Sequence, residues 1–165
     1  MLNNSYVESM SRLLSFQKIF MLCWLAPILS FANTFDEAQQ AATDSRYKDV
    51  VELLSISFES GELALQDEVV AYSNIGVSCS LLQAYGLATQ DLEHALSVDN
   101  ENTLTLNHLG LLAEQVDRDY VTARGYYERV SLLGFPVSQV NLANLYRSGR
   151  GLEQNFSRTF ELYDV

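Results

Sequence analysis

The sequence contains few prolines, few cysteines and few basic side chains. Two prolines and eight glycines in 165 residues leave long stretches without a helix breaker, which favours helices over a turn-rich β-structure. Ten Lys and Arg against 21 Asp and Glu give a net charge of −11, and the basic residues are scattered. Because nucleic acids and anionic lipids are bound by clustered Lys and Arg, we expect neither as a partner.

Residues 1–32 have the features of a bacterial signal peptide. Arg12 and Lys18 precede an apolar run over 19–32 that is interrupted by Pro27. This run is shorter than the ~20 apolar residues that a membrane-spanning helix needs. The segment therefore predicts export, with an uncleaved membrane anchor as the alternative.

Cleavage is expected after Ala32. Ser30 and Ala32 are small residues at the third and first positions before the cut, and polar residues follow directly. The mature domain would then span 33–165 and be periplasmic or secreted. Only Cys79 would remain in it, so no internal disulfide is expected.

An internal repeat begins near Val69. Within 69–102, apolar and small residues recur at helical spacing on two successive segments: Tyr72, Ile75, Gly76, Cys79, Tyr85, Ala88, Leu92 and Ala95. Small residues at Gly76 and Ala88 allow two antiparallel helices to cross closely. The unit is therefore expected to form a helix pair.

The first helix of this unit recurs twice downstream. The equivalent positions are Leu106, Leu109, Gly110 and Ala113, and then Gln139, Leu142, Ala143 and Tyr146. The second helix of the middle unit is shifted by one residue, which places Ala123 opposite Gly110. Upstream, a weaker pattern predicts helices over 35–42 and 47–54. About four pairs are expected.

The loop after the third copy contains two glycines, Gly149 and Gly151, which can adopt positive φ and reverse the chain. Leu152 is expected to fill the turn, and Asn155 to cap the next helix. The segment 141–155 resembles the Sel1 variant of the tetratricopeptide repeat, and the spacing from Val69 onward resembles the tetratricopeptide repeat family. The resemblance implies an all-α fold, a right-handed α-solenoid of antiparallel helix pairs.

Proteins of this family bind partners on a concave surface lined by the first helices. The resemblance places ten residues of this chain there: Val70, Ser73, Val77, Leu81, Leu104, Asn107, Leu111, Val140, Asn144 and Arg147. This apolar strip with amide groups suits an extended or helical peptide with hydrophobic anchors. The alternative is that several of these side chains pack on neighbouring helices. The lysines of the carboxylate-binding class are absent.

The resemblance implies a non-catalytic scaffold or adaptor in the cell envelope that binds a protein or peptide. No metal or other cofactor is expected, because His94 and His108 have no second ligand at metal-site spacing. Cys79 is interpreted as a core thiol. An accessory or regulatory subunit of a cell-wall enzyme complex is the alternative function.

The sequence stops at Val165 without the polar capping helix that usually covers a terminal repeat. The last helix is expected to leave an apolar edge formed by Phe156, Phe160, Leu162 and Tyr163. Such an edge predicts self-association or a truncated gene product.

Overall fold

A computed structural model describes residues 34–60, 63 and 65–164, so the predicted signal peptide over 1–32 lies outside the described residues. The described part contains α-helices and one π-helical turn, η3, and no strand: α2 (Thr34–Thr43), α3 (Tyr47–Ser60), α4 (Leu65–Leu81), α5 (Tyr85–Val98), α6 (Thr103–Leu112), η3 (Ala113–Asp117), α7 (Tyr120–Leu132), α8 (Pro136–Ser148) and α9 (Phe156–Tyr163).

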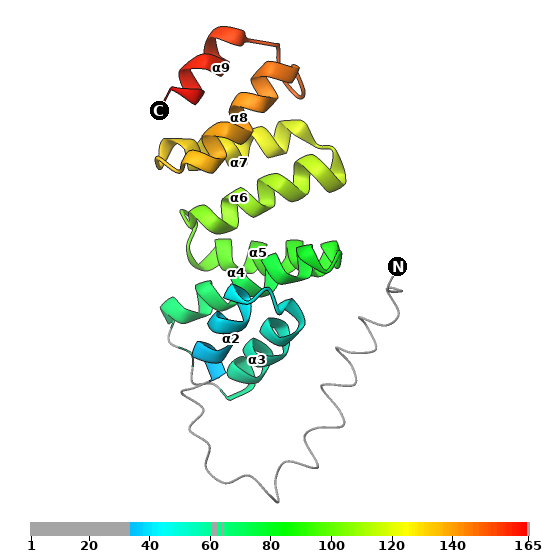
Figure 1. Cartoon of the computed structure of the whole chain (residues 1–165), viewed down its shortest axis with the longest axis vertical. Helices are drawn as coiled ribbons and strands as arrows, with labels where there is room; N and C mark the ends of the chain where they lie inside the picture. The colour runs from blue at the N-terminus through cyan, green and yellow to red at the C-terminus, as the bar shows by residue number, and fades with distance from the viewer. Residues whose placement is uncertain (1–33, 61–62, 64, 165) are drawn as a thin grey trace, which may run out of the picture.

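The helices stack in sequence order along one direction, with α2 and α3 at one end and α8 and α9 at the other (Figure 1). Consecutive helices pack as the pairs α2–α3, α4–α5, α6–α7 and α8–α9, and each pair contacts the next. The predicted all-α solenoid of about four helix pairs is confirmed.

Polar caps fix where several of these helices begin. The side chains of Asn102, Asp119 and Asn155 each accept a hydrogen bond from the backbone N–H three residues further on, at 2.9–3.1 Å. These bonds satisfy amide groups that have no partner within the helix. The predicted cap at Asn155 is confirmed.

The two helices of the α4–α5 pair cross at a glycine. A Cβ at Gly76 would lie 2.6 Å from Cγ of Leu92 and 3.1 Å from the carbonyl oxygen of Ala88. The first distance is shorter than real Cβ contacts and the second is tighter than most of them, so glycine allows this approach without a shift of Leu92. The predicted close crossing of Gly76 and Ala88 is confirmed.

The α6–α7 pair has the same arrangement with a larger side chain. A Cβ at Gly110 would lie 2.5 Å from Cε1 of Tyr127, which is fully buried. Helix α6 continues into the π-turn η3, and Arg118 follows it with φ 57°. Because a π-turn holds one residue more than an α-helical turn, it accounts for the one-residue shift that the sequence displays at Ala123.

The glycine loop between α8 and α9 closes as predicted. Gly149 and Gly151 have φ of 71° and 70°, and Leu152 packs against the apolar cluster formed by α7, α8 and α9. A Cβ at Gly151 would lie 2.6 Å from Cβ of Tyr120, so glycine is needed there for space as well as for its backbone angle. The loop thereby contacts the start of α7.

Candidate protein-binding groove

The first helices α4, α6 and α8 are connected by buried polar contacts. The hydroxyl oxygens of Ser73 and Thr105 lie 2.7 Å apart, and Ser138 donates a hydrogen bond to Oδ1 of Asn107 at 2.8 Å. Asn141 also donates to Oδ1 of Asn107, at 3.3 Å. Equivalent residues therefore make a buried hydrogen bond both between α4 and α6 and between α6 and α8.

These contacts correct two positions in the predicted groove. The exposed fractions of Ser73 and Asn107 are 1% and 5%, so neither side chain lies on the groove surface. Both are short polar side chains that point toward the next first helix and find hydrogen-bonding groups there. The expectation that Ser73 and Asn107 face a ligand is wrong, since their polar atoms connect helices.

The other predicted groove residues retain surface area. Three of them are half-buried, Val77, Leu111 and Asn144, and five are exposed: Val70, Leu81, Leu104, Val140 and Arg147. Val70 and Leu104 are each 39% exposed, and Val137 at the equivalent position of α8 is 53% exposed. One apolar side chain per first helix thus forms a row across α4, α6 and α8.

A second row was missed by the sequence analysis. Asn74, His108 and Asn141 are half-buried and lie four residues after Val70, Leu104 and Val137, one turn further along the same helix face. Burial lowers the pKa of His108, so its imidazole is neutral at pH 7. The signal was available in the sequence, because these polar residues recur at the repeat spacing.

Helix α9 meets the groove at Asn144. The hydroxyl of Tyr163 donates a hydrogen bond to Oδ1 of Asn144 at 2.8 Å, and Arg147 lies 3.4 Å from the same atom. Phe156, Phe160 and Tyr163 are exposed, as predicted for the apolar edge. Leu162 is only 6% exposed and packs into the core, so its predicted place in that edge is wrong.

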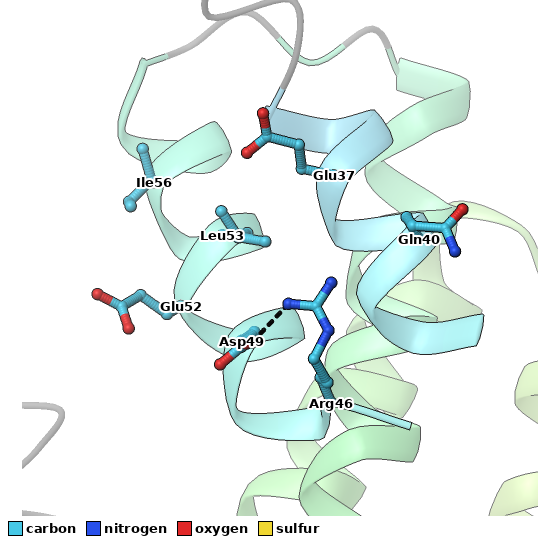
Figure 2. A pocket seen from close by; sticks show the side chains of 7 residues that line it. All are labelled: Glu37, Gln40, Arg46, Asp49, Glu52, Leu53 and Ile56. Atoms are coloured by element: carbon cyan, nitrogen blue, oxygen red, sulfur yellow. Dashed lines mark hydrogen bonds and ion pairs between the residues drawn. The ribbon is translucent and has the colours of Figure 1, made fainter. Parts of the chain in front are cut away.

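An open recess lies between α2 and α3 (Figure 2). It is lined by three carboxylates, one guanidinium, one amide and two aliphatic side chains: Glu37, Asp49, Glu52, Arg46, Gln40, Leu53 and Ile56. Arg46 donates to Asp49 at 2.7 Å and lies 3.5 Å from Asp44. The α2–α3 end of the stack is therefore acidic and polar.

The titratable groups between α4 and α5 have structural partners. His94 lies 3.6 Å from Glu68, and its ring centroid is 4.0 Å from that of Tyr72. Burial, together with the nearby carboxylate of Asp91, raises the pKa of Cys79 to about 12, so this thiol is protonated and buried as predicted.

Within the described residues, no group of three or more His, Cys, Asp or Glu side chains could hold a metal ion. Among the same residues, no helix is both long enough and apolar enough to cross a membrane. Both statements apply only to the described part of the chain, so the predictions about cofactors and catalysis stay predictions.

Comparison with known proteins identifies the fold class. The solved structure titled "Crystal structure of MamA" is similar to this chain, with a TM-score of 0.65 and 16% sequence identity over 82% of this chain and 75% of that chain. MamA is a helical solenoid of the tetratricopeptide type. At this identity the likeness shows the fold alone. No protein-family model matches the sequence, and no curated protein sequence matches it.

Proposed function

We propose that this chain is a non-catalytic protein-interaction module, a scaffold or adaptor, that binds a peptide segment of a partner along α4, α6 and α8. The proposal is carried by one observation, the row of exposed apolar side chains Val70, Leu104 and Val137 at equivalent positions of the three helices. The tetratricopeptide-type fold of MamA supports a binding role over a catalytic one.

The spacing of this row favours an extended ligand. Packed helices lie 8–10 Å apart, and the contacts of Ser73 with Thr105 and of Asn107 with Ser138 hold α4, α6 and α8 as direct neighbours. An extended chain in the polyproline II conformation rises about 3.1 Å per residue with three residues per turn, so every third side chain recurs on the same face at about 9 Å. A ligand with apolar side chains at every third residue would match the row.

The adjacent polar row suits the backbone of such a ligand. An extended peptide has free N–H and C=O groups, which need hydrogen-bond partners when they leave water. Asn74 and Asn141 carry amides that can both donate and accept, and neutral His108 carries one donor and one acceptor. The ligand would therefore be held by apolar contacts and neutral hydrogen bonds.

We further propose that the interaction takes place in the bacterial cell envelope. This part rests on the signal-peptide features of residues 1–32 in the sequence. Processing of the exported chain can be measured directly by N-terminal sequencing of the protein from cell fractions, with Asn33 as the expected first residue. An intact N-terminus in the cytoplasmic fraction would contradict it.

Photocrosslinking in producing cells tests the groove. A photoreactive residue at Val77 or Leu111, on the concave face, is expected to capture the same partner. A residue at Leu132, which is 89% exposed at the end of α7 and outside the groove, is the matched control and should not capture it. The captured segment should then compete as a synthetic peptide.

A charge in the row should abolish this capture. Leu104→Asp places a carboxylate against the apolar side chains of the ligand, whereas Leu132→Asp adds the same charge elsewhere. Capture lost in the first variant and kept in the second supports the proposal. Equal capture from both variants, with native helicity by circular dichroism, would refute groove binding.

A further inference from the structure

Three aromatic side chains line one side of α9: Phe156, Phe160 and Tyr163. We call this surface the α9 face. The exposed fractions are 55%, 66% and 43%, and Phe160 is the most exposed aromatic residue of the described chain. Because the three residues are four and three positions apart, their side chains are neighbours along the helix. They form one continuous apolar ridge.

Helix α7 provides the internal comparison, because it holds equivalent positions 36 residues earlier. These positions are Tyr120, Arg124 and Tyr127, which are half-buried, half-buried and fully buried. The following pair covers Tyr120 and contributes to the burial of Tyr127, which also packs against Gly110 of its own pair. The guanidinium of Arg150 lies 5.5 Å from the ring centroid of Tyr120, Gly151 touches the backbone of Tyr120, and Tyr127 packs in one cluster with Leu142.

The α9 face thus exposes positions that, one step earlier in the same fold, are partly covered by the next helix pair. We propose that the α9 face of a second copy of this chain covers it, in a dimer with two-fold symmetry. A two-fold contact pairs identical surfaces, so the apolar ridge meets apolar side chains without a new complementary surface. This inference does not depend on groove binding.

The other end of the stack does not fit the α9 face. A head-to-tail contact would place the recess between α2 and α3 (Figure 2) against the aromatic rings. The carboxylates of Glu37, Asp49 and Glu52 would then leave water against aromatic rings that carry no positive charge. Burial of charged groups is costly, which disfavours that arrangement.

Charge distribution favours contact through the α8–α9 end. Residues 33–102 contain 13 acidic and 2 basic side chains, a net charge of −11, whereas residues 103–165 contain 7 and 6, a net charge of −1. In the proposed dimer the nearly neutral parts meet and the acidic parts lie at opposite ends. Repulsion between them is screened beyond about 10 Å at 0.1 M salt.

The size of the α9 face determines how strongly the two copies are expected to bind each other. Aromatic side chains expose roughly 200 Å² each when free, so the exposed parts of the three rings amount to about 300 Å² per copy. Stable interfaces bury about 800 Å² per partner. The dimer is therefore expected to be weak and to depend on protein concentration.

Sedimentation velocity across micromolar to millimolar concentrations tests the proposal. The sample is the protein purified in the form that the producing cells yield. We expect a reversible monomer–dimer transition, unchanged in Leu132→Asp and weakened about tenfold or more in Phe160→Asp, which buries two carboxylates in the contact. Both residues are exposed in the monomer, and circular dichroism verifies that each variant folds.

Crosslinking identifies the surface that is used. A photoreactive residue at Phe156 should give a product of twice the chain mass, whose crosslinked peptides both come from α9. A monomer at all concentrations overturns the proposal, as does open-ended association with crosslinks from α9 to α2 or α3. Crosslinks between α9 and another protein, without self-association, overturn it as well.

Discussion

In the α4–α5 pair the glycine at the helix crossing faces Leu92, whereas in the α6–α7 pair it faces Tyr127, and both side chains are fully buried. The larger ring reaches further, and its hydroxyl donates a hydrogen bond to Glu114 at 3.0 Å. Glu114 lies in the π-turn η3. The extra residue of that turn and the tyrosine therefore belong to one local arrangement that the α4–α5 pair lacks.

The backbone of the first helix thus adapts to the side chain opposite its glycine. Burial, together with the nearby side chain of Glu114, raises the pKa of Tyr127. The hydroxyl is thus a neutral donor at any physiological pH. Leu92, which needs no polar partner, packs against an uninterrupted α-helix.

Truncation of the side chains opposite the two glycines should lower the stability of the protein most. Tyr127→Ala is expected to lower the free energy of unfolding by about 4 kcal/mol, and Leu92→Ala by about 3 kcal/mol, because each leaves a cavity in a core that cannot collapse fully. Urea denaturation measures both values. A smaller loss for Tyr127→Ala would show that α6 and η3 relax into the space.

Filling the glycines should have the next largest effect. Gly110→Ala brings a methyl group to 2.5 Å from the buried ring of Tyr127, so about 2 kcal/mol of stability should be lost. Gly125→Ala in α7 is the matched control. A Cβ there meets nothing within 4 Å, and alanine favours a helix by up to about 1 kcal/mol. Equal effects in urea denaturation would contradict the close crossing.

Asp91 and Tyr126 occupy equivalent half-buried positions, three residues after Ala88 and Ala123, but only Asp91 is a carboxylate. Burial raises the pKa of Asp91 to about 6, an effect that His94 partly opposes. The pKa of an unfolded aspartate is about 3.9. Since the folded value is higher, this group's contribution to stability is fully present below pH 4 and is lost as the pH rises through 6.

Asp91→Asn tests this pH dependence. The variant should be more stable than the parent at pH 8, by about 1 kcal/mol after allowance for the solvent contact of the side chain, and nearly equal to it at pH 4. Thermal unfolding at several pH values measures the difference. Glu93→Gln, which changes an exposed residue of the same helix in the same way, is the matched control.

The smallest expected effect concerns the turns of the two pairs. Gln83 and Arg118 follow α4 and η3 with φ of 62° and 57°, a conformation that glycine adopts at lower cost. Gln83→Gly and Arg118→Gly are each expected to raise the free energy of unfolding by about 0.5 kcal/mol. A loss of stability at Arg118 alone would show that its side chain supports the π-turn.

The sequence predicted the helix pairs because their packing leaves a periodic trace of small and apolar residues, as at Gly76 and Gly110. It predicted the turn at Gly149 and Gly151 because few other residues adopt positive φ. The sequence also showed the one-residue shift of the second helix at Ala123, but it did not show that a π-turn causes this shift. A π-turn depends on contacts such as that of Tyr127 with Glu114, which link distant parts of the chain.

The groove was predicted only in part. Ser73 and Asn74 are adjacent in sequence and differ by about 100° around the helix, and a repeat alignment does not determine which of them faces the next helix. Side-chain size and the partners Thr105 and Ser138 decide it, because a short hydroxyl or amide can be enclosed between first helices. The apolar row required no such knowledge of partners.

The buried contacts between first helices also determine how the stack can deform. Between α4 and α6 and between α6 and α8 they are directional, and a slip of one helix by one residue, 1.5 Å, would break them. At the junction of α2 and α4, the equivalent positions hold Phe35 and Ala71, which belong to one apolar cluster, and apolar packing has no preferred direction.

Bending should therefore concentrate between α2–α3 and the remaining helices, with α4, α6 and α8 moving as one stiff segment. A ligand along the groove would therefore contact α4, α6 and α8 at a constant spacing, while the acidic α2–α3 pair changes its angle relative to these helices.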